Sequence, residues 1–115
     1  MTYIIYHNTR CKKSRAGLQY LEEKGIKPII VEYLKDQAFS EKSLGDLLVK
    51  LALKPQEIIR TQEADYKQKF KGKELSDEEW IKILVENPKL IKRPIVEKDD
   101  VAVLGDIVEH IDVLL

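Results

Sequence analysis

The only cysteine in the chain, Cys11, lies between an apolar run and a segment with a helical pattern. The apolar run at residues 3–6 predicts a strand, so we expect Cys11 at a strand-to-helix turn. The free backbone N–H groups of a helix's first turn favour an anion, and therefore a thiolate over a thiol. This position suits a nucleophile that also binds oxyanions.

Arginine is scarce, and its positions indicate where an oxyanion could be held. Only four of the 20 basic residues are arginines: Arg10 and Arg15 flank the cysteine, whereas Arg60 and Arg93 are distant in sequence. Arginine presents a planar fork of donors to a tetrahedral oxyanion, whereas lysine is a point charge. The alternative is that the chain simply has a low arginine content.

Charge and hydropathy argue against several classes of function. The chain has 20 basic and 20 acidic residues, so no basic field favours nucleic acid as a partner. No apolar run approaches the roughly 20 residues of a membrane span, and no leader pattern precedes the first strand, so we expect a cytoplasmic protein with a free thiol. One cysteine and two distant histidines, His7 and His110, lack the spacing of metal ligands.

The N-terminal third predicts a strand, a helix and a second strand. The helix is expected from about Ser14 to Lys24, with Gly25 as its left-handed C-terminal residue. Residues 28–33 contain a β-branched apolar run and predict a buried strand. Two such strands joined by a helix form a parallel pair with a right-handed crossover.

The middle of the chain predicts only helices, of which the first has the clearest pattern. Ser40 is expected to cap it, and one buried stripe comprises Leu44, Leu47, Leu48 and Leu51. Pro55 fits the first turn of a short helix that ends near Arg60.

Two further helices are expected before the chain returns to strands. Residues 61–74 suggest a weakly anchored helix that closes at Gly72. Ser76 and Glu79 have the spacing of a capping box, which would begin a helix that carries Trp80 into the core and stops at Asn87-Pro88.

The C-terminal part predicts a hairpin and a last helix. Residues 95–96 and 101–104 form two short apolar runs around a turn-like segment. After Gly105, apolar residues repeat at helical spacing: Ile107, Val108, Ile111 and Leu115. His110 lies in this last helix and is expected to be partly exposed.

The order of elements predicts one α/β domain over residues 1–115. A parallel βαβ half and an antiparallel ββα half build a mixed sheet with helices on its faces. The plan is a thioredoxin-like mixed sheet (βαβ + ββα) with a central all-helical insertion at about residues 38–88.

In this plan the loop after the first strand approaches the start of the third strand, where Arg93-Pro94 lies. A proline at such a turn is often cis, because an X–Pro bond loses little in that form. Arg93 could then place its guanidinium beside Cys11. The alternative is an ordinary edge-strand proline with an exposed arginine.

Four separated motifs, which occur in order along the chain, are Tyr6 to Arg15, Ile59-Arg60, Asn87-Pro88 and Arg93-Pro94-Ile95-Val96. Together they resemble the ArsC family of glutaredoxin-linked arsenate reductases. The resemblance implies that the Cys11 thiolate attacks the arsenic of arsenate, that glutathione adds to the intermediate, and that glutaredoxin completes reduction to arsenite. It implies no bound cofactor, with glutathione as a co-substrate.

The resemblance also implies roles for particular residues. Arg60 and Arg93 match two oxyanion-holding arginines of the family. Asn8 and Ser14, with backbone N–H groups around them, would complete the cradle. His7 could support the thiolate electrostatically or orient the loop by hydrogen bonds. Arg15 and Pro94 are expected to support the site.

Two positions depart from the expected pattern. Asp106 lies where the family has a third oxyanion arginine, and the reading we favour for it is a cap on the final helix. Ser14 lies where a dithiol enzyme of this fold has its second cysteine, so the second thiol must come from glutathione or a partner protein.

These departures leave alternatives open. One is a glutathione-dependent thiol reductase that does not act on arsenate. Another is a protein-binding module similar to the Spx regulators, which bind RNA polymerase, and a third is an inert copy of the fold. The sequence leaves open the thiol donor, the oligomeric state and whether residues 61–74 form a lid.

Overall fold

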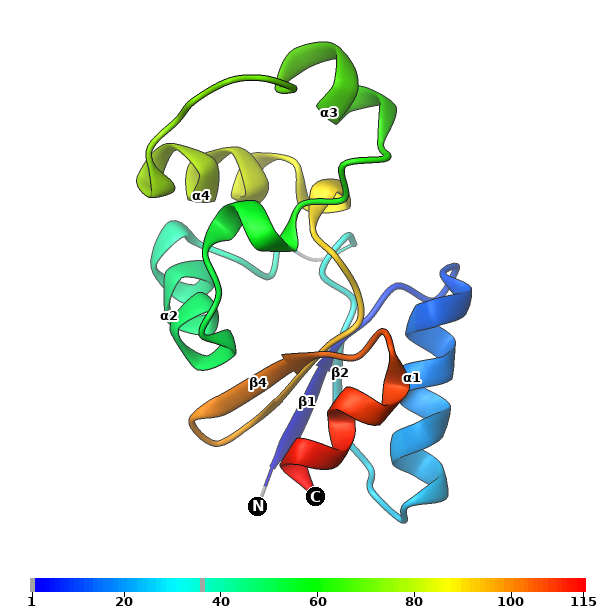
Figure 1. Cartoon of the computed structure of the whole chain (residues 1–115). Helices are drawn as coiled ribbons and strands as arrows, with labels where there is room; N and C mark the ends of the chain where they lie inside the picture. The colour runs from blue at the N-terminus through cyan, green and yellow to red at the C-terminus, as the bar shows by residue number, and fades with distance from the viewer. Residues whose placement is uncertain (1, 36) are drawn as a thin grey trace. The chain divides into compact units, whose positions relative to one another are not determined.

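The computed structural model describes residues 2–35 and 37–115. The chain forms two compact units. The first comprises Met1–Ala38 and Arg93–Leu115, and the second comprises Phe39–Lys92. The ends of the chain therefore build the first unit together, and the middle builds the second (Figure 1).

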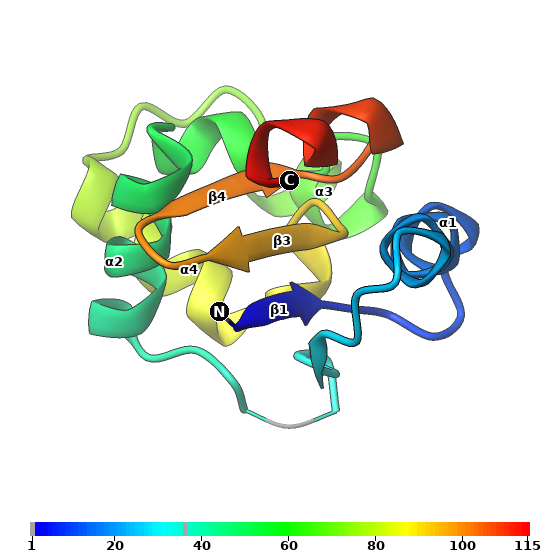
Figure 2. The same cartoon turned by 90° about the horizontal axis from the view of Figure 1, so that it is seen from below.

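The first unit contains a four-stranded mixed sheet with the order β2-β1-β3-β4. Its strands are β1 (Tyr3–Tyr6), β2 (Ile29–Val31), β3 (Ile95–Lys98) and β4 (Val101–Leu104). β1 pairs in parallel with β2 and antiparallel with β3, which pairs antiparallel with β4. Figure 2 shows β1, β3 and β4 side by side. The expected thioredoxin-like mixed sheet is confirmed.

The expected hairpin is present in β3 and β4, but β3 is longer and the turn is shorter than the sequence pattern predicted. Lys98 faces Val101 in the register, so two residues make the turn. Asp99 adopts a φ of 54°, which an aspartate in a tight hairpin turn tolerates.

The core of the first unit lies between the sheet and two helices, α1 (Lys12–Glu23) and the 3₁₀ helix η3 (Val108–Leu114). Each of these elements contributes buried apolar side chains to one cluster, which comprises Ile5, Leu21, Val96, Ile111 and Leu114. Ile111 and Leu114 are three residues apart, and a 3₁₀ helix brings such residues onto one face. The last helix thus differs from the expected repeat, since Ile107 and Leu115 are exposed.

Pro94 packs the second segment of the first unit, residues 93–115, against its first segment. The Arg93-Pro94 bond is cis. A Cβ on Gly17 of α1 would lie 2.7 Å from Pro94 Cγ, and one on Gly105 would lie 2.9 Å from the same atom. The Gly105 N–H also donates to the Pro94 carbonyl at 2.7 Å. Only glycine permits these approaches, so Pro94 and the neighbouring Arg93 are held against α1.

β2 differs from the expected buried strand. It spans Ile29–Val31, within the expected 28–33, and Ile29 and Ile30 are 55% and 47% exposed. β2 is an edge strand of the sheet, so its apolar run is not covered on both faces as the run of a central parallel strand would be. Tyr33, just after β2, is buried instead.

The second unit is all-helical, with α2 (Glu41–Leu51), α3 (Ala64–Lys69), α4 (Asp77–Glu86) and two 3₁₀ turns, η1 (Pro55–Ile58) and η2 (Pro88–Leu90). The expected leucine stripe of α2 is buried, and serine side chains cap α2 and α4 as predicted. Trp80 is buried and contacts the rings of Tyr66 and Phe70, with centroids 6.5 and 6.2 Å apart.

Two details of the second unit differ from the sequence pattern. The helix expected at residues 61–74 is the short α3, which has no buried residue. The unit also extends to Lys92, because Ile91 forms an antiparallel bridge with Ile59 and the Lys92 N–H donates to the Ile58 carbonyl at 2.8 Å. Over the described residues, no helix has the length and apolar character needed to cross a membrane.

Candidate functional site

A tight turn places Cys11 at the beginning of α1. The Cys11 N–H donates to the Asn8 carbonyl at 3.0 Å, which closes a β-turn over residues 8–11. The Asn8 side chain accepts from the Arg10 N–H at 3.1 Å and braces the turn from inside. Cys11 is the N-cap residue of α1, with extended backbone and no side-chain cap bond. The helix begins at Lys12, slightly earlier than expected.

The Cys11 thiol is partly buried, and its surroundings favour the thiolate. Burial raises the pKa of Cys11, but three donors outweigh it: the Ser14 N–H, the Arg93 guanidinium and the Lys13 N–H. The net pKa is therefore lowered. The first turn of α1 and the segment before β3 thus converge on one sulfur, a combination that is typical of nucleophilic cysteines.

The Ser14 hydroxyl connects the turn to a buried histidine. Ser14 Oγ accepts from the Asn8 N–H at 2.9 Å and lies 2.7 Å from His7 Nδ1. Both Ser14 and His7 are buried. Burial lowers the pKa of His7, although the Glu32 carboxylate opposes it, so His7 is neutral near pH 7. These contacts favour the loop-orienting alternative for His7 over electrostatic support of the thiolate.

Arg93 lies at the Cys11 thiol and also touches Tyr33, with Nη1 3.5 Å from the Tyr33 hydroxyl. Burial acts to lower the pKa of Arg93, but Tyr33 and Cys11 outweigh it and raise the pKa, so the guanidinium stays charged. The packing of Pro94 against Gly17 and Gly105 fixes where this side chain begins.

Arg15 contacts the turn from the helix side. Its Nη1 donates to the Thr9 carbonyl at 2.9 Å, and its own N–H donates to the Cys11 carbonyl at 3.0 Å. Arg15 therefore braces the turn, and its part in the site stays a prediction.

Arg60 belongs to the second unit. Its guanidinium pairs with Glu63 at 2.5 Å, and its N–H donates to the Leu90 carbonyl at 2.7 Å. The first unit thus brings together His7, Asn8, Cys11, Ser14, Arg15, Arg93 and Pro94, and a part for Arg60 at the thiolate stays a prediction.

Asp106 does not cap the last helix, contrary to expectation. The N-cap of η3 is Ile107, with no side-chain cap bond. The Asp106 carboxylate instead pairs with Lys13 Nζ at 3.0 Å, and both side chains are substantially exposed. The carboxylate thus lies beside the first turn of α1, where it offsets a lysine charge.

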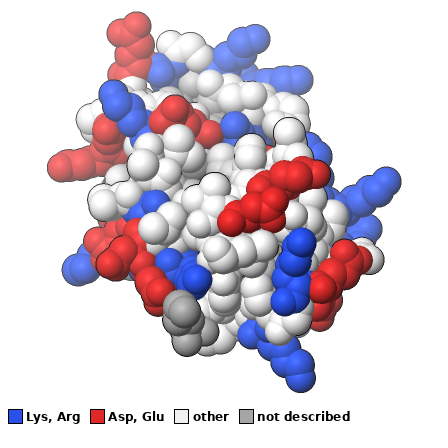
Figure 3. All heavy atoms as spheres, turned by 60° about the horizontal axis from the view of Figure 1, so that its bottom comes forward, with Lys and Arg blue, Asp and Glu red and all other residues white. Residues whose placement is uncertain are grey.

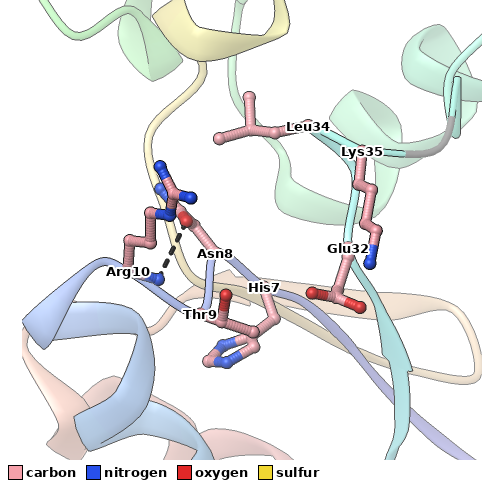
Figure 4. A pocket seen from close by; sticks show the side chains of 7 residues that line it. All are labelled: His7, Asn8, Thr9, Arg10, Glu32, Leu34 and Lys35. Carbon is pink, nitrogen blue, oxygen red and sulfur yellow. Dashed lines mark hydrogen bonds between the residues drawn. The ribbon is translucent and has the colours of Figure 1, made fainter.

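A pocket of about 390 Å³ lies against the 8–11 turn (Figure 4). We call it the turn pocket. One wall is the loop after β1, with His7, Asn8, Thr9 and Arg10, and the other is the segment after β2, with Glu32, Leu34 and Lys35. Sequence reasoning missed the second wall. The second wall could have been predicted from the expected parallel pairing of β1 and β2. Adjacent parallel strands end at the same edge of a sheet, so the residues that follow them lie close together.

On the face drawn in Figure 3, the charges do not single out another site. The face drawn in Figure 3 carries Lys and Arg interspersed with Asp and Glu, in agreement with the balanced composition. Among residues 2–35 and 37–115, no group of three or more potential ligands is placed to hold a metal ion.

Comparisons with known proteins place this arrangement in a family. Residues 6–113 match the model of the ArsC family. The chain is 41% identical over 107 residues to the arsenate reductase of Haemophilus influenzae, covering 91% of each protein. It is 42% identical over 103 residues to the uncharacterized protein YfgD of Escherichia coli, covering 88% of this chain and 86% of the relative. The solved structure of the arsenate reductase from Vibrio cholerae superposes with a TM-score of 0.94 at 37% identity, over 100% of this chain and 98% of that one.

Proposed function

Because the chain belongs to the ArsC family, we propose that it is an arsenate reductase with Cys11 as the nucleophile and with glutathione and glutaredoxin as reductants. The observation that carries the proposal is the Cys11 thiol at the start of α1, where the Ser14 N–H and Arg93 outweigh the effect of burial on its pKa. The relatives named arsenate reductase support the choice of substrate.

The proposed reaction balances as follows. The Cys11 thiolate bonds to the arsenic of arsenate, and an arsenate oxygen leaves as water. The sulfur of glutathione replaces a second oxygen, which also leaves as water. A glutaredoxin thiolate then attacks the glutathione sulfur, and the sulfur–arsenic bonding pair stays on arsenic, which is reduced by two electrons. Water displaces the Cys11 sulfur and releases arsenite.

Each site residue has a part in holding the oxyanion or the nucleophile. Arg93 supplies a charged fork for arsenate oxygens, and Arg60 is proposed to supply a second. Asn8, Ser14 and the N–H groups of the first turn of α1 complete the cradle, since preorganised donors stabilise the charge that develops as arsenic is attacked. His7, Arg15 and Pro94 fix the geometry of the turn and of Arg93.

The test is steady-state reduction of arsenate with glutathione and glutaredoxin, with arsenite measured directly. We expect Cys11→Ser to lose at least about a thousandfold in turnover, as removal of a nucleophile does. The exposed-surface variant Lys27→Gln should keep the wild-type rate. Equal turnover by Cys11→Ser and wild type, or no turnover by either, would remove the proposal.

The Lys13–Asp106 pair favours a second candidate, a thiol–disulfide reductase that acts on mixed disulfides of glutathione. A carboxylate beside the first turn of α1 opposes an arsenate anion but not an uncharged disulfide bond. Because both side chains are exposed, we expect Asp106→Asn to raise kcat/KM for arsenate only about two- to fivefold. Such a rise, with disulfide reduction faster than arsenate reduction in both proteins, would favour this second candidate, whereas an unchanged arsenate value would remove its premise.

A further inference from the structure

The turn pocket is separate from the place where Cys11 meets Arg93, yet it shares a wall with it. Neither Cys11 nor Arg93 lines the pocket. The Asn8–Cys11 turn is the common element, because its middle residues Thr9 and Arg10 line the pocket and its last residue is the nucleophile. The ends of a β-turn lie within about 7 Å of each other. The Asn8–Cys11 turn is therefore the element that separates a ligand in the pocket from the Cys11 sulfur.

The charges of the turn pocket have both signs and come from opposite walls. Arg10 lies on the loop wall, and Glu32 and Lys35 lie on the wall after β2 (Figure 4). His7 forms part of the lining as a buried, neutral imidazole. Leu34 and Thr9 add less polar surface between the charges. The volume lies in the range of small-molecule sites.

This charge pattern selects a zwitterionic ligand with more negative than positive groups. Two cations and one carboxylate give the pocket a surplus of one positive charge. Glutathione has two carboxylates and one ammonium group, so it complements the pocket in number and in sign. The chain has one cysteine, and therefore the second thiol of the reaction must arrive on a separate molecule.

We propose that the turn pocket binds the charged ends of glutathione, with Glu32 at the ammonium group and Arg10 and Lys35 at the carboxylates. This inference rests on the proposed function for the identity of the thiol. Charge-assisted hydrogen bonds at opposite walls orient the tripeptide and present its sulfur across the turn to Cys11. Small thiols that lack these charged groups gain nothing from the pocket.

The test uses a half-reaction that needs no arsenate. The Cys11 thiolate attacks one sulfur of glutathione disulfide, the S–S bond breaks, one glutathione leaves as a thiolate, and the other remains on Cys11 as a mixed disulfide. The same reaction with the uncharged hydroxyethyl disulfide is the reference. Mass spectrometry of the intact protein gives both rate constants.

We expect Glu32→Gln and Lys35→Gln each to slow the reaction with glutathione disulfide roughly three- to fivefold, and the double variant about tenfold or more. The rate with hydroxyethyl disulfide should stay within a factor of two, as measured in the same experiment. Glu22→Gln and Lys27→Gln, exposed positions in the same unit, are the matched charge controls and should change neither rate.

Equal effects of the pocket variants on both disulfides, or equal effects of pocket and control variants, would overturn the inference. A second measurement avoids the reaction altogether. In titrations of the Cys11→Ser protein with S-methylglutathione, followed by amide NMR shifts, residues 8–10 and 32–35 should shift in a saturable way, and Lys35→Gln should weaken that binding. Shifts elsewhere only, or none, would also overturn it.

Failure of this inference can be told apart from failure of the proposed function. If arsenate is turned over but the pocket variants show no selectivity, only the glutathione subsite is wrong. If arsenate is not turned over but the selectivity is found, the subsite stands and arsenate is the wrong substrate.

Discussion

The three longest helices, α1 in the first unit and α2 and α4 in the second, begin in different ways, and the difference bears on the candidate site. In the second unit, α2 and α4 begin at serines whose side chains accept from the third residue of the helix, in complete capping boxes. In the first unit, α1 begins at Cys11 with no side-chain cap bond. A serine side chain accepts from a first-turn N–H group in α2 and in α4, whereas first-turn N–H groups of α1 lie at the Cys11 sulfur.

The two units also differ in the range of the contacts that build them. The second unit is one continuous segment with local caps and stripes. The first joins residues from both ends of the chain, and its reactive pair, Cys11 and Arg93, comes from different segments. The site therefore depends on tertiary packing at Gly17, Pro94 and Gly105.

The largest effect on stability is expected from one substitution made in both units. Gly17→Ala would place a Cβ 2.7 Å from Pro94 Cγ, whereas a Cβ on Gly45 of α2 meets nothing within 4 Å. We expect Gly17→Ala to lower the free energy of unfolding by about 2–3 kcal/mol through overpacking. Gly45→Ala should raise it by about 0.5–1 kcal/mol, because alanine favours a helix interior. Denaturant titration measures both, and two changes of the same sign would contradict the packing account.

A pair of serines separates a structural cap from a site residue. Ser14→Ala leaves the Asn8 N–H and His7 Nδ1 without their buried partner and should cost about 2 kcal/mol. Ser76→Ala removes a helix cap and should cost about 1 kcal/mol. Only Ser14→Ala should slow alkylation of Cys11 by iodoacetamide. Equal alkylation rates in the two variants would show that the Ser14 hydroxyl does not set the geometry of the turn.

The uncapped start of α1 predicts a gain in stability from an inactivating change. Serine is a preferred N-cap residue and cysteine is not. Cys11→Ser should therefore raise the free energy of unfolding by about 0.5–1 kcal/mol, while it abolishes the reaction with disulfides. A stability below that of the wild type would show that the thiol itself contributes to the fold at this position.

The buried His7 of the first unit predicts that the stability of the protein depends on pH. The pKa of His7 is lowered in the fold, so below its unfolded value of about 6.5 the unfolded chain binds a proton that the folded chain does not. Its contribution to stability is fully present above pH 6.5 and is lost as the pH falls from there toward the lowered pKa. Unfolding free energies between pH 8 and pH 5 should fall less steeply in His7→Asn. An equal slope in both proteins would contradict the assignment of a neutral, buried His7.

The sequence predicts best what is built from local contacts. The leucine stripe of α2, the two serine caps and the hairpin of β3 and β4 depend on neighbours within a few positions, and the structure confirms them. The prediction that β2 is buried was wrong, because an apolar run does not show whether its strand is central or at an edge of the sheet. The prediction that Asp106 caps the last helix was wrong, because its ion-pair partner, Lys13, lies far away in the sequence.

The candidate site was predictable in part for the same reason. Cys11, its position before a helix, and the approach of Arg93 follow from a motif and a sheet plan. The role of Ser14 as the link between His7 and Asn8 is visible only in three dimensions. The turn pocket was missed because Glu32 and Lys35 follow an edge strand and belong to no motif, and only strand pairing brings them opposite Arg10.

The central claim is that Cys11 is held as a thiolate by donors from α1 and by Arg93. The pKa of Cys11, measured from the ultraviolet absorbance of the thiolate or from the pH dependence of alkylation, tests it most directly. We expect a pKa below the ordinary free-thiol value of about 8.5, and a higher pKa in Arg93→Gln than in the wild type. A wild-type pKa at or above that value, or one that Arg93→Gln leaves unchanged, would contradict the account.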